Sequence, residues 1–211
     1  EVTLRTPAAM EAIAEMKTVP GAIVGAGTVV NEAQAKAVID AGVEFIVSPG
    51  LTERLARPIM DSGVAYLPGT ATAGDIMRGL DLGLTHFKFF PAETSGGLKA
   101  LKALDAPFYQ CRFCPTGGIT EASAPDWLAF DPVLCVGGSW VTGGSMTDVE
   151  AKARAEGTDK SVADAAAVIV KAIQTVTSDY SRVQNVVTST SAIWLSHVRT
   201  ALRVATKQVK K

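Results

Sequence analysis

The sequence predicts an α/β fold, and the ends of its strands favour a closed (β/α)8 (TIM) barrel over an open doubly wound sheet. Short apolar runs rich in β-branched residues alternate with amphipathic stretches from residue 1 to about residue 140. Strands that alternate with helices at this spacing pair in parallel, because each connection must cross the sheet through a helix. The runs are apolar on both faces, as expected of strands between outer helices and an inner core.

Seven apolar runs are predicted to be strands, one fewer than a complete barrel, and five stretches between them are predicted to be helices. The strands are expected at residues 1–5, 22–28, 45–49, 65–69, 87–91, 112–119 and 134–140. The helices are expected at residues 8–16, 32–41, 52–62, 73–82 and 97–104. Most runs end in small or polar residues, such as Thr28, Gly50 and Gly118. In a barrel all strand ends meet at one rim, whereas an open sheet needs special residues only near its switch point.

The composition changes beyond Gly144, and no catalytic motif follows. Residues 160–176 and 191–209 each carry an apolar stripe at helical spacing. The segment between them is rich in Ser and Thr, with a candidate short strand at residues 183–187. We therefore expect a barrel domain at residues 1–160 and a helical C-terminal segment at residues 161–211.

The charge balance gives no electrostatic argument for nucleic acid or an anionic membrane as a partner, since the formal net charge is −1. No run of 18 apolar residues is present, so no transmembrane helix is expected. The three cysteines, two of them in apolar runs, predict reduced thiols in a cytoplasmic protein. Cys111 and Cys114 have C-x-x-C spacing, but no second pair accompanies them and both histidines lie elsewhere in the sequence. Neither a metal nor another cofactor is therefore expected.

Lys88 is the strongest candidate for a catalytic residue. Strand alternation would place Phe87 and Phe89 on one face, and Lys88 with Phe90 on the other, inside the barrel. Burial disfavours the charged ammonium form of lysine, and the neutral amine can attack a carbonyl carbon. The pattern alone leaves open a lysine on an edge strand that extends to solvent.

Glu1 and Arg5 would share one face of the first strand, because residues i and i+4 of a strand point to the same side. In that position Glu1 could transfer protons and Arg5 could bind a carboxylate through two hydrogen bonds. A buried ion pair explains the same pattern, and the residues alone favour that simpler interpretation.

Two glycine pairs close the last two runs: Gly117-Gly118, and Gly137-Gly138 followed by Ser139. Glycine lets backbone N–H groups approach an anion closely, and barrels bind phosphate after the seventh and eighth strands. Glycine pairs also form tight turns. Two pairs at successive strand ends nevertheless favour an anion site.

Six motifs in this order resemble the bacterial 2-keto-3-deoxy-6-phosphogluconate (KDPG) aldolase family, which also acts on 4-hydroxy-2-oxoglutarate (KHG). They are Glu-Val-Thr-Leu-Arg-Thr6, Gly-Ala-Gly-Thr28, Ser-Pro-Gly-Leu51, Phe-Lys-Phe-Phe-Pro-Ala-Glu93, Arg-Phe-Cys-Pro-Thr-Gly-Gly118 and Gly-Gly-Ser-Trp140. The resemblance covers about residues 1–144. It implies a homotrimeric (β/α)8 class I aldolase of the Entner–Doudoroff pathway, a lyase that forms pyruvate through a Schiff base.

The resemblance also implies roles for individual residues. Lys88 matches the family's Schiff-base lysine, and Glu1 matches its general acid/base. The residues implied to bind substrate are Arg5 and Thr28 near the pyruvate carboxylate, Pro49 and Phe90 lining the pocket, Thr116 beside the pyruvyl group, and Gly117, Gly118, Gly138 and Ser139 at the phosphate. The expected ligands are a phosphorylated 2-keto-3-deoxy sugar acid and pyruvate, with no nucleic acid and no membrane.

The chain departs from the family at both ends. The family has a helix, a first strand and its helix before the residue that Glu1 matches, and it ends after one closing helix, whereas this chain continues to Lys211. Three explanations stay open: a missing first strand, a circular permutation in which residues 183–187 supply that strand, and an unrelated helical fusion.

Two alternatives to KDPG cleavage stay open as well. One is a sister aldolase acting on KHG or on the galactonate epimer of the substrate. The other is an assembly or scaffold protein that uses the trimeric barrel as a platform, with the C-terminal segment mediating contacts. The presence of Lys88 and Glu1 argues against a loss of catalysis.

Overall fold

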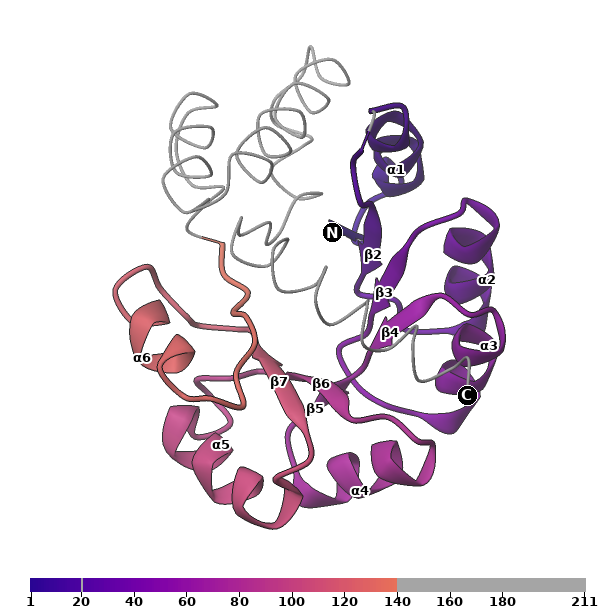
Figure 1. Ribbon diagram of the computed structural model, residues 1–211. Coiled ribbons are helices and arrows are strands. Elements are labelled where there is room, and N and C mark those ends of the chain that lie inside the picture. The colour runs from indigo at the N-terminus through magenta and orange to yellow at the C-terminus, as the bar shows by residue number, and fades with distance from the viewer. Residues whose placement is uncertain (20, 140–211) are drawn as a thin grey trace.

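The computed structural model describes residues 1–19 and 21–139 as a curved parallel sheet with helices along its outer side (Figure 1). The strands are β1 (Val2–Thr3), β2 (Gly25–Gly27), β3 (Phe45–Val47), β4 (Ala65–Leu67), β5 (Gly69–Thr70), β6 (His86–Phe89) and β7 (Arg112–Pro115). The helices are α1 (Ala9–Lys17), α2 (Glu32–Asp40), α3 (Glu53–Asp61), α4 (Ala73–Asp81), α5 (Gly97–Asp105), the 3-10 helix η1 (Ala106–Phe108) and α6 (Ala124–Leu128). The segments expected at residues 160–176, 183–187 and 191–209, and with them the C-terminal region 161–211, lie outside the described residues.

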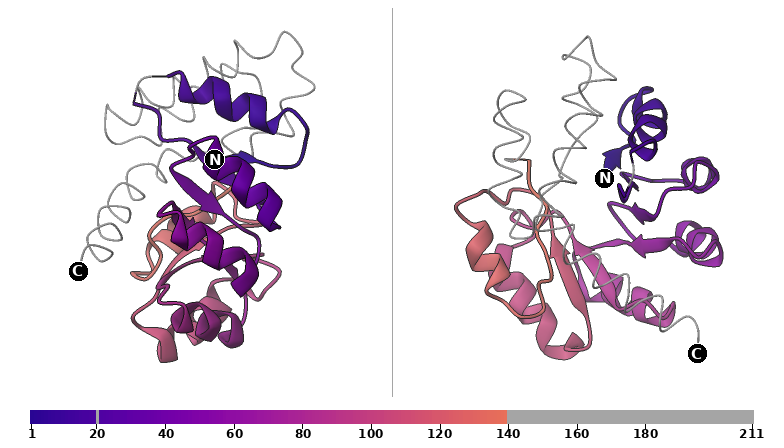
Figure 2. Two further views of the ribbon diagram at one scale, coloured as in Figure 1. Left: turned by 90° about the vertical axis from the view of Figure 1, so that its right-hand side faces the viewer. Right: turned by 45° about the horizontal axis from the view of Figure 1, so that its top comes forward.

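The paired strands run parallel, as the alternation of strands and helices predicts. β1 to β4 pair in chain order, and β5 to β7 do the same. Pro68, which separates β4 from β5, still takes part in the sheet. Its carbonyl oxygen accepts a hydrogen bond from Lys88 N–H on β6 at 2.8 Å. Figures 1 and 2 show the helices following the strands around the outside of one arc. The predicted α/β class is therefore confirmed for the described residues.

Several predicted strands are shorter than their apolar runs, and two of them have a clear local reason. Residues 65–69 divide into β4 and β5 at Pro68, whose ring nitrogen has no hydrogen to donate to a neighbouring strand. The run that begins at Arg112 ends at Pro115, because Gly117 and Gly118 adopt positive φ angles of 105° and 83° that leave the extended conformation.

The prediction of a last strand at residues 134–140 is wrong, because the described residues 134–139 do not form a regular strand. Only isolated bridges join this segment to its neighbour, between Val133 and Phe113 and between Gly137 and Thr116. The segment still runs alongside β7 in parallel. Its two glycines lack the side chains that stabilise a strand through packing, which accounts for the interrupted pairing.

The five predicted helices are all present, with ends within one residue of the expected positions. Polar side chains fix the starts of three of them by accepting a backbone hydrogen bond. These caps are Asn31 for α2, Thr52 for α3 and Thr72 for α4. The sequence pattern does not predict α6, which has only five residues and a proline in its first turn.

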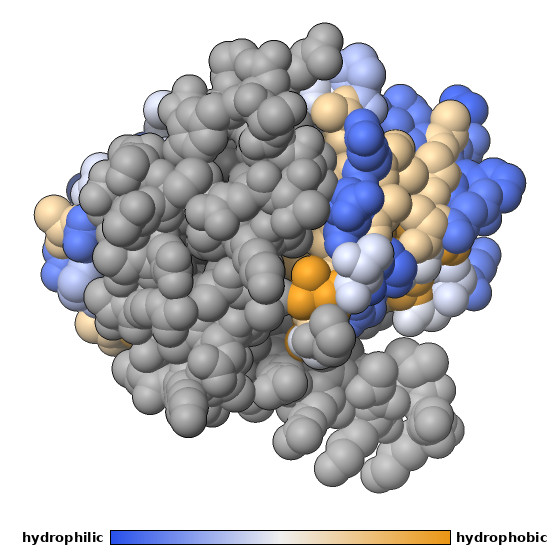
Figure 3. Space-filling model, turned by 90° about the horizontal axis from the view of Figure 1, so that it is seen from above, coloured by the Kyte–Doolittle hydropathy of each residue, from blue (hydrophilic) through white to orange (hydrophobic). Residues whose placement is uncertain are grey.

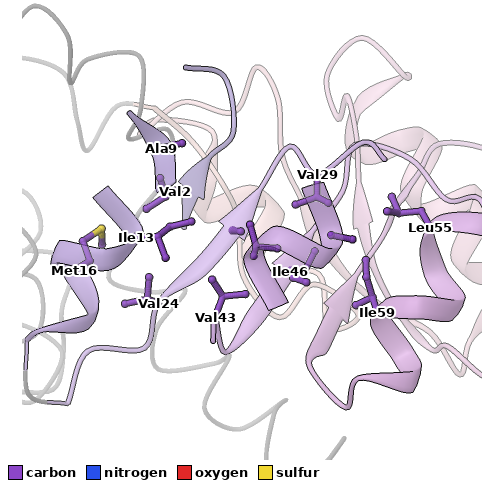
Figure 4. Packing of buried hydrophobic residues seen from close by; sticks show 13 residues of the cluster. Val2, Ala9, Ile13, Met16, Val24, Val29, Val43, Ile46, Leu55 and Ile59 are labelled. Carbon is purple, nitrogen blue, oxygen red and sulfur yellow. The ribbon is translucent and has the colours of Figure 1, made fainter. Parts of the chain in front are cut away.

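Most of the hydrophobic core lies between the sheet and the helices. One cluster joins β1 to β3 with α1 to α3 and includes Ile13, Val24, Ile46 and Ile59 (Figure 4). A second cluster joins β6 and β7 with α4 to α6. A third, smaller cluster lies on the opposite side of the strands, and its buried members are Phe45, Val47, Cys114 and Cys135. The strands are thus apolar on both faces, as predicted.

Where Figure 3 leaves the described residues visible, hydrophilic and apolar residues are interspersed on that face. Among the described residues, the exposed large hydrophobic side chains are Val30, Met77 and Tyr109. No described helix combines the length and the apolar character that crossing a lipid bilayer requires.

Gly79 allows α4 to pack closely on β6, because a Cβ atom at this position would lie 2.2 Å from the Phe87 ring. We expect Gly79→Ala to destabilise the fold by roughly 1–3 kcal/mol, the usual cost of overpacking a core. Gly74→Ala in the same helix is the control, since a Cβ there meets only Thr72 Oγ1, at 3.8 Å. Urea denaturation measures both free energies of unfolding. Equal values for the two variants would contradict this packing.

Candidate active site

Lys88 lies on the inner face of the sheet, as strand alternation predicts. Phe87 and Phe89 are fully buried in the outer cluster, whereas the Lys88 Nζ atom lies 4.6 Å from the centroid of the Phe90 ring. In the register of the sheet Lys88 pairs with Gly69 on one side and Cys114 on the other. Lys88 is 8% exposed, so the residue is largely enclosed by the protein.

Glu1 approaches the same inner site from the other end of the described sheet. The residue precedes β1 and is 9% exposed. Burial raises the pKa of its carboxyl group, because removal from water disfavours the charged form. The nearby positive charges of Lys88 and Arg5 oppose this rise in the pKa. The structure therefore brings Glu1 and Lys88 within electrostatic reach of each other.

Gly27 is a site residue that the sequence interpretation missed. A Cβ atom at this position would lie 1.7 Å from Glu1 Oε1 and 2.4 Å from its carboxyl carbon. The Glu1 carboxylate thus lies directly against the backbone of β2. Only glycine leaves this space, and the Gly-Ala-Gly-Thr28 motif was the available signal.

The predicted position of Arg5 on the inner face of the first strand is wrong. β1 ends at Thr3, and Arg5 N–H donates to the carbonyl oxygen of Thr3 at 2.8 Å in a tight turn. This turn leads the chain through Pro7 into α1 and leaves Arg5 exposed. Its charge nevertheless contributes to the pKa of Glu1, so Arg5 lies at the margin of the site.

Thr28 and Pro49 follow β2 and β3, at the same edge of the sheet as Phe90 after β6. Thr28 has a φ angle of 59°, a left-handed conformation that is uncommon for a β-branched residue. Such strain is tolerated where the surrounding structure imposes it, often at functional sites. The Pro49 carbonyl oxygen lies so close to Gly69 that a Cβ on Gly69 would be 2.2 Å away. Thr28 and Pro49 are both partly buried.

Thr116, Gly117 and Gly118 form the turn after β7, beside the lysine. A Cβ atom on Gly117 would lie 3.4 Å from Phe90 Cδ2, so this turn contacts the ring that lies next to Lys88. Backbone hydrogen bonds tie the turn to the end of β6: Thr116 N–H donates to Phe89 at 2.9 Å, and Thr116 accepts from Ala92 N–H at 2.8 Å.

Gly138 and Ser139 follow directly after the bridge between Thr116 and Gly137. The Gly137 N–H donates to Pro115 at 2.8 Å, and a Cβ on Gly137 would lie 2.7 Å from Thr116 Oγ1. Gly138 is buried and Ser139 is exposed. The two glycine pairs therefore lie on adjacent segments at the same edge of the sheet, as predicted.

The cysteines are arranged differently from what their C-x-x-C spacing suggests. Cys111 belongs to the outer cluster, whereas Cys114 and Cys135 belong to the inner cluster. Cys135 shares a hydrogen bond with Cys114, and this bond together with burial raises the pKa of Cys135 well above its ordinary value. All three cysteines are buried thiols that form no disulfide bond. In residues 1–19 and 21–139, no cluster of His, Cys, Asp and Glu side chains could hold a metal ion.

The arrangement brings together an amine, a buried carboxyl group and two glycine turns at one edge of the sheet. Lys88 offers an amine, and Glu1 offers a carboxyl group whose raised pKa suits proton transfer nearer to neutral pH. The glycine turns offer backbone N–H groups at the rim. These elements suit covalent catalysis on a carbonyl compound that carries negative charge.

Comparison with known proteins gives consistent similarities. A model of the aldolase family described as KDPG and KHG aldolase matches residues 1–156. The 2-dehydro-3-deoxy-phosphogluconate aldolase of Zymomonas mobilis is 58% identical over 149 residues, which cover 71% of this chain and 72% of that protein. The KHG/KDPG aldolase of Escherichia coli is 54% identical over 142 residues, or 67% of each chain.

A solved structure is similar as well. It is the KDPG aldolase of Legionella pneumophila, with pyruvate captured at low pH as a covalent carbinolamine intermediate. Its TM-score is 0.66 at 36% identity, over 84% of this chain and 80% of that chain.

The buried carboxyl group of Glu1 predicts a pH-dependent cost to stability. Its pKa in the folded protein lies above the ordinary value of 4.5, so below pH 4.5 the group is protonated whether the chain is folded or unfolded. As the pH rises through the folded pKa, the folded protein must hold a buried charge and loses stability. We expect Glu1→Gln to raise the free energy of unfolding at pH 8 and to change it little at pH 4.

Urea denaturation at the two pH values measures this difference. Glu53→Gln, at an exposed position on α3, is the control and should show no comparable gain at pH 8. A gain for Glu1→Gln that is equal at both pH values, or a loss at pH 8, would show that burial does not penalise the Glu1 charge.

Proposed function

The chain belongs to the KDPG and KHG aldolase family, and from this premise we propose that it cleaves KDPG to pyruvate and glyceraldehyde 3-phosphate through a Schiff base on Lys88. The observation that carries the proposal is the inner face that Lys88 and Glu1 share, beneath glycine turns at one edge of the sheet. The relatives that this chain matches at 54–58% identity are named KDPG or KHG/KDPG aldolases.

Lys88 acts as the nucleophile. Its amine adds to the C2 carbonyl carbon of the substrate, and loss of water from the carbinolamine gives an iminium ion. The iminium accepts the electron pair of the C3–C4 bond as that bond breaks, so glyceraldehyde 3-phosphate leaves and an enamine remains. Protonation of the enamine at C3 and hydrolysis of the iminium release pyruvate and free Lys88. The carbinolamine in the Legionella pneumophila relative supports this route.

Glu1 acts as the general acid/base. Cleavage requires removal of the proton from the C4 hydroxyl group, and the enamine then requires a proton at C3. One carboxyl group can serve both steps, directly or through water, if its pKa lies near the working pH. Burial against Gly27 raises the pKa of Glu1 toward that range, which supports the assignment.

Substrate binding divides between the two ends of the substrate. We assign the pyruvate carboxylate to Arg5 and Thr28, and the pyruvyl group to a pocket lined by Pro49, Phe90 and Thr116. The phosphate is assigned to Gly117, Gly118, Gly138 and Ser139. Their positions after β7 and on the adjacent segment support this assignment, because backbone N–H groups at a sheet edge bind dianions without needing a lysine.

Further features of the family belong to the same proposal. The curved sheet is proposed to complete a (β/α)8 barrel, and the active protein is proposed to be a cytoplasmic homotrimer. KHG and the galactonate epimer are the alternative substrates. The scaffold alternative depends on residues 161–211, which lie outside the described part of the chain.

Cleavage of KDPG by the purified protein tests the function, with pyruvate measured through reduction by lactate dehydrogenase. Lys88→Arg keeps the positive charge but removes the amine that can form an imine, because a guanidinium stays protonated at any accessible pH. We expect this variant to show no turnover above background. Lys99→Arg, at an exposed position on α5, is the control and should retain wild-type turnover.

Two outcomes would contradict the proposal. One is a wild-type protein that is folded but forms no pyruvate from KDPG, KHG or the galactonate epimer. The other is a Lys88→Arg variant that keeps wild-type turnover.

A further inference from the structure

Glu93 is an exposed carboxylate next to the glycine turn assigned to the substrate phosphate, and catalysis as derived above does not use it. A negative charge beside a site for a dianion weakens binding by repulsion, so a carboxylate in this position calls for another role. We infer that Glu93 and Trp127 form a strap that holds the Gly117-Gly118 turn in the shape that binds the substrate phosphate. This inference rests on the proposed function, because it assumes that this turn binds the phosphate.

The backbone of Glu93 is the first attachment of the strap. Glu93 N–H donates to the carbonyl oxygen of Gly117 at 3.0 Å, next to the bond from Ala92 N–H to Thr116 at 2.8 Å. Two consecutive hydrogen bonds thus join the segment after β6 to the turn after β7. Because both φ angles in the turn are positive, its conformation is one that few residues other than glycine adopt.

The stem of the Glu93 side chain is the second attachment. A Cβ atom on Gly118 would lie 2.7 Å from Glu93 Cγ and 2.8 Å from Glu93 Cβ. The methylene groups of Glu93 therefore pack directly on the Gly118 backbone. Any side chain at position 118 would occupy the space that these groups fill. A shift of this side chain would change the surroundings of the turn.

The carboxylate of Glu93 is the third attachment. Its Oε1 atom accepts a hydrogen bond from Trp127 Nε1 at 3.1 Å. Trp127 lies on α6, is 2% exposed and packs on Phe89 with ring centroids 6.3 Å apart, so it is a rigid anchor. An indole N–H is a donor only, and burying it without a partner costs free energy, so Trp127 in turn holds the carboxylate.

The second carboxylate oxygen faces the start of α5. A Cβ atom on Gly97, the first residue of that helix, would lie 3.5 Å from Glu93 Oε2. The N-terminus of a helix carries partial positive charge, which stabilises a carboxylate beside it. The hydrogen bond from Trp127 to Oε1 and the position of Oε2 beside this helix start limit how far the Glu93 charge can move toward a bound phosphate.

Trp127→Phe is the direct test, because it keeps an aromatic ring in the core and removes the N–H donor. We expect the KM for KDPG to rise about tenfold, the scale of one hydrogen bond to a charged group. The value of kcat should stay within about twofold. The kcat/KM for KHG, which has no phosphate, should also stay within about twofold, since the lysine end of the site is unchanged.

Glu93 provides matched variants that do not alter the core. Glu93→Ala should raise the KM for KDPG as Trp127→Phe does, and the double variant should be no worse than either single variant. Glu93→Gln keeps an oxygen that accepts from Trp127 Nε1, so it should recover most of the wild-type KM. Asp126→Asn, on the exposed side of the same helix, is the control and should match the wild type.

Competitive inhibition reports binding of the phosphate by a ligand that is not itself cleaved. The inhibition constant of 3-phosphoglycerate, which carries the phosphate but cannot be cleaved, should rise with the KM for KDPG in Trp127→Phe and Glu93→Ala. Thermal melts ensure that each variant is compared while folded.

Three results would overturn the strap. They are equal losses for KDPG and KHG, an unchanged KM for KDPG in both Trp127→Phe and Glu93→Ala, and a Glu93→Gln variant as weak as Glu93→Ala. A wild-type protein that cleaves neither substrate would instead reject the proposed function on which the strap rests.

Discussion

The carboxyl group of Glu1 and the amine of Lys88 lie on the inner face of one sheet, where burial raises the pKa of the carboxyl group and neighbouring positive charges offset part of that rise. Neither residue can be understood alone. The carboxyl group is held at a raised pKa because it is enclosed, and it is kept from a still higher pKa by Lys88 and Arg5. The rest of the described structure can be seen as what keeps these two groups enclosed and facing one site.

The sheet and its glycines supply that enclosure. Lys88 lies on β6, a strand paired on both sides and backed by the buried rings of Phe87 and Phe89, so its direction is fixed. Gly27 lets the Glu1 carboxylate lie directly on β2. Parallel pairing also brings the carboxyl ends of the strands to one edge, where the turn after β7 contacts Phe90. The parallel sheet thus determines which side chains reach the site, and the glycines determine how closely these side chains approach the neighbouring backbone.

The alternation of apolar residues and the helix signals predict most strands and helices from the sequence. The features that they do not predict are short turns and contacts between segments that are distant in the sequence. Lys88 was placed correctly because a strand of period two leaves only two faces. Arg5 was misplaced because a turn from Thr3 ends β1 early, and no pattern in five residues reveals that turn. The contact between Gly27 and Glu1 joins two segments that are separate in the sequence. The Gly-Ala-Gly-Thr28 motif therefore indicates the end of a strand, but it does not reveal which side chain the glycine makes room for. Cys114 shares a hydrogen bond with Cys135 because the segment beside β7, and not the sequence spacing, brings the two side chains together.

The identity of the lysine that forms the Schiff base is the central claim, and trapping the imine tests it most directly. Incubation of the intact protein with pyruvate and borohydride, followed by peptide mass spectrometry, should locate a reduced pyruvyl adduct on Lys88. The exposed Lys99 and Lys102 should stay unmodified under the same conditions. An adduct on another lysine, or none in a sample shown to be folded, would contradict the account.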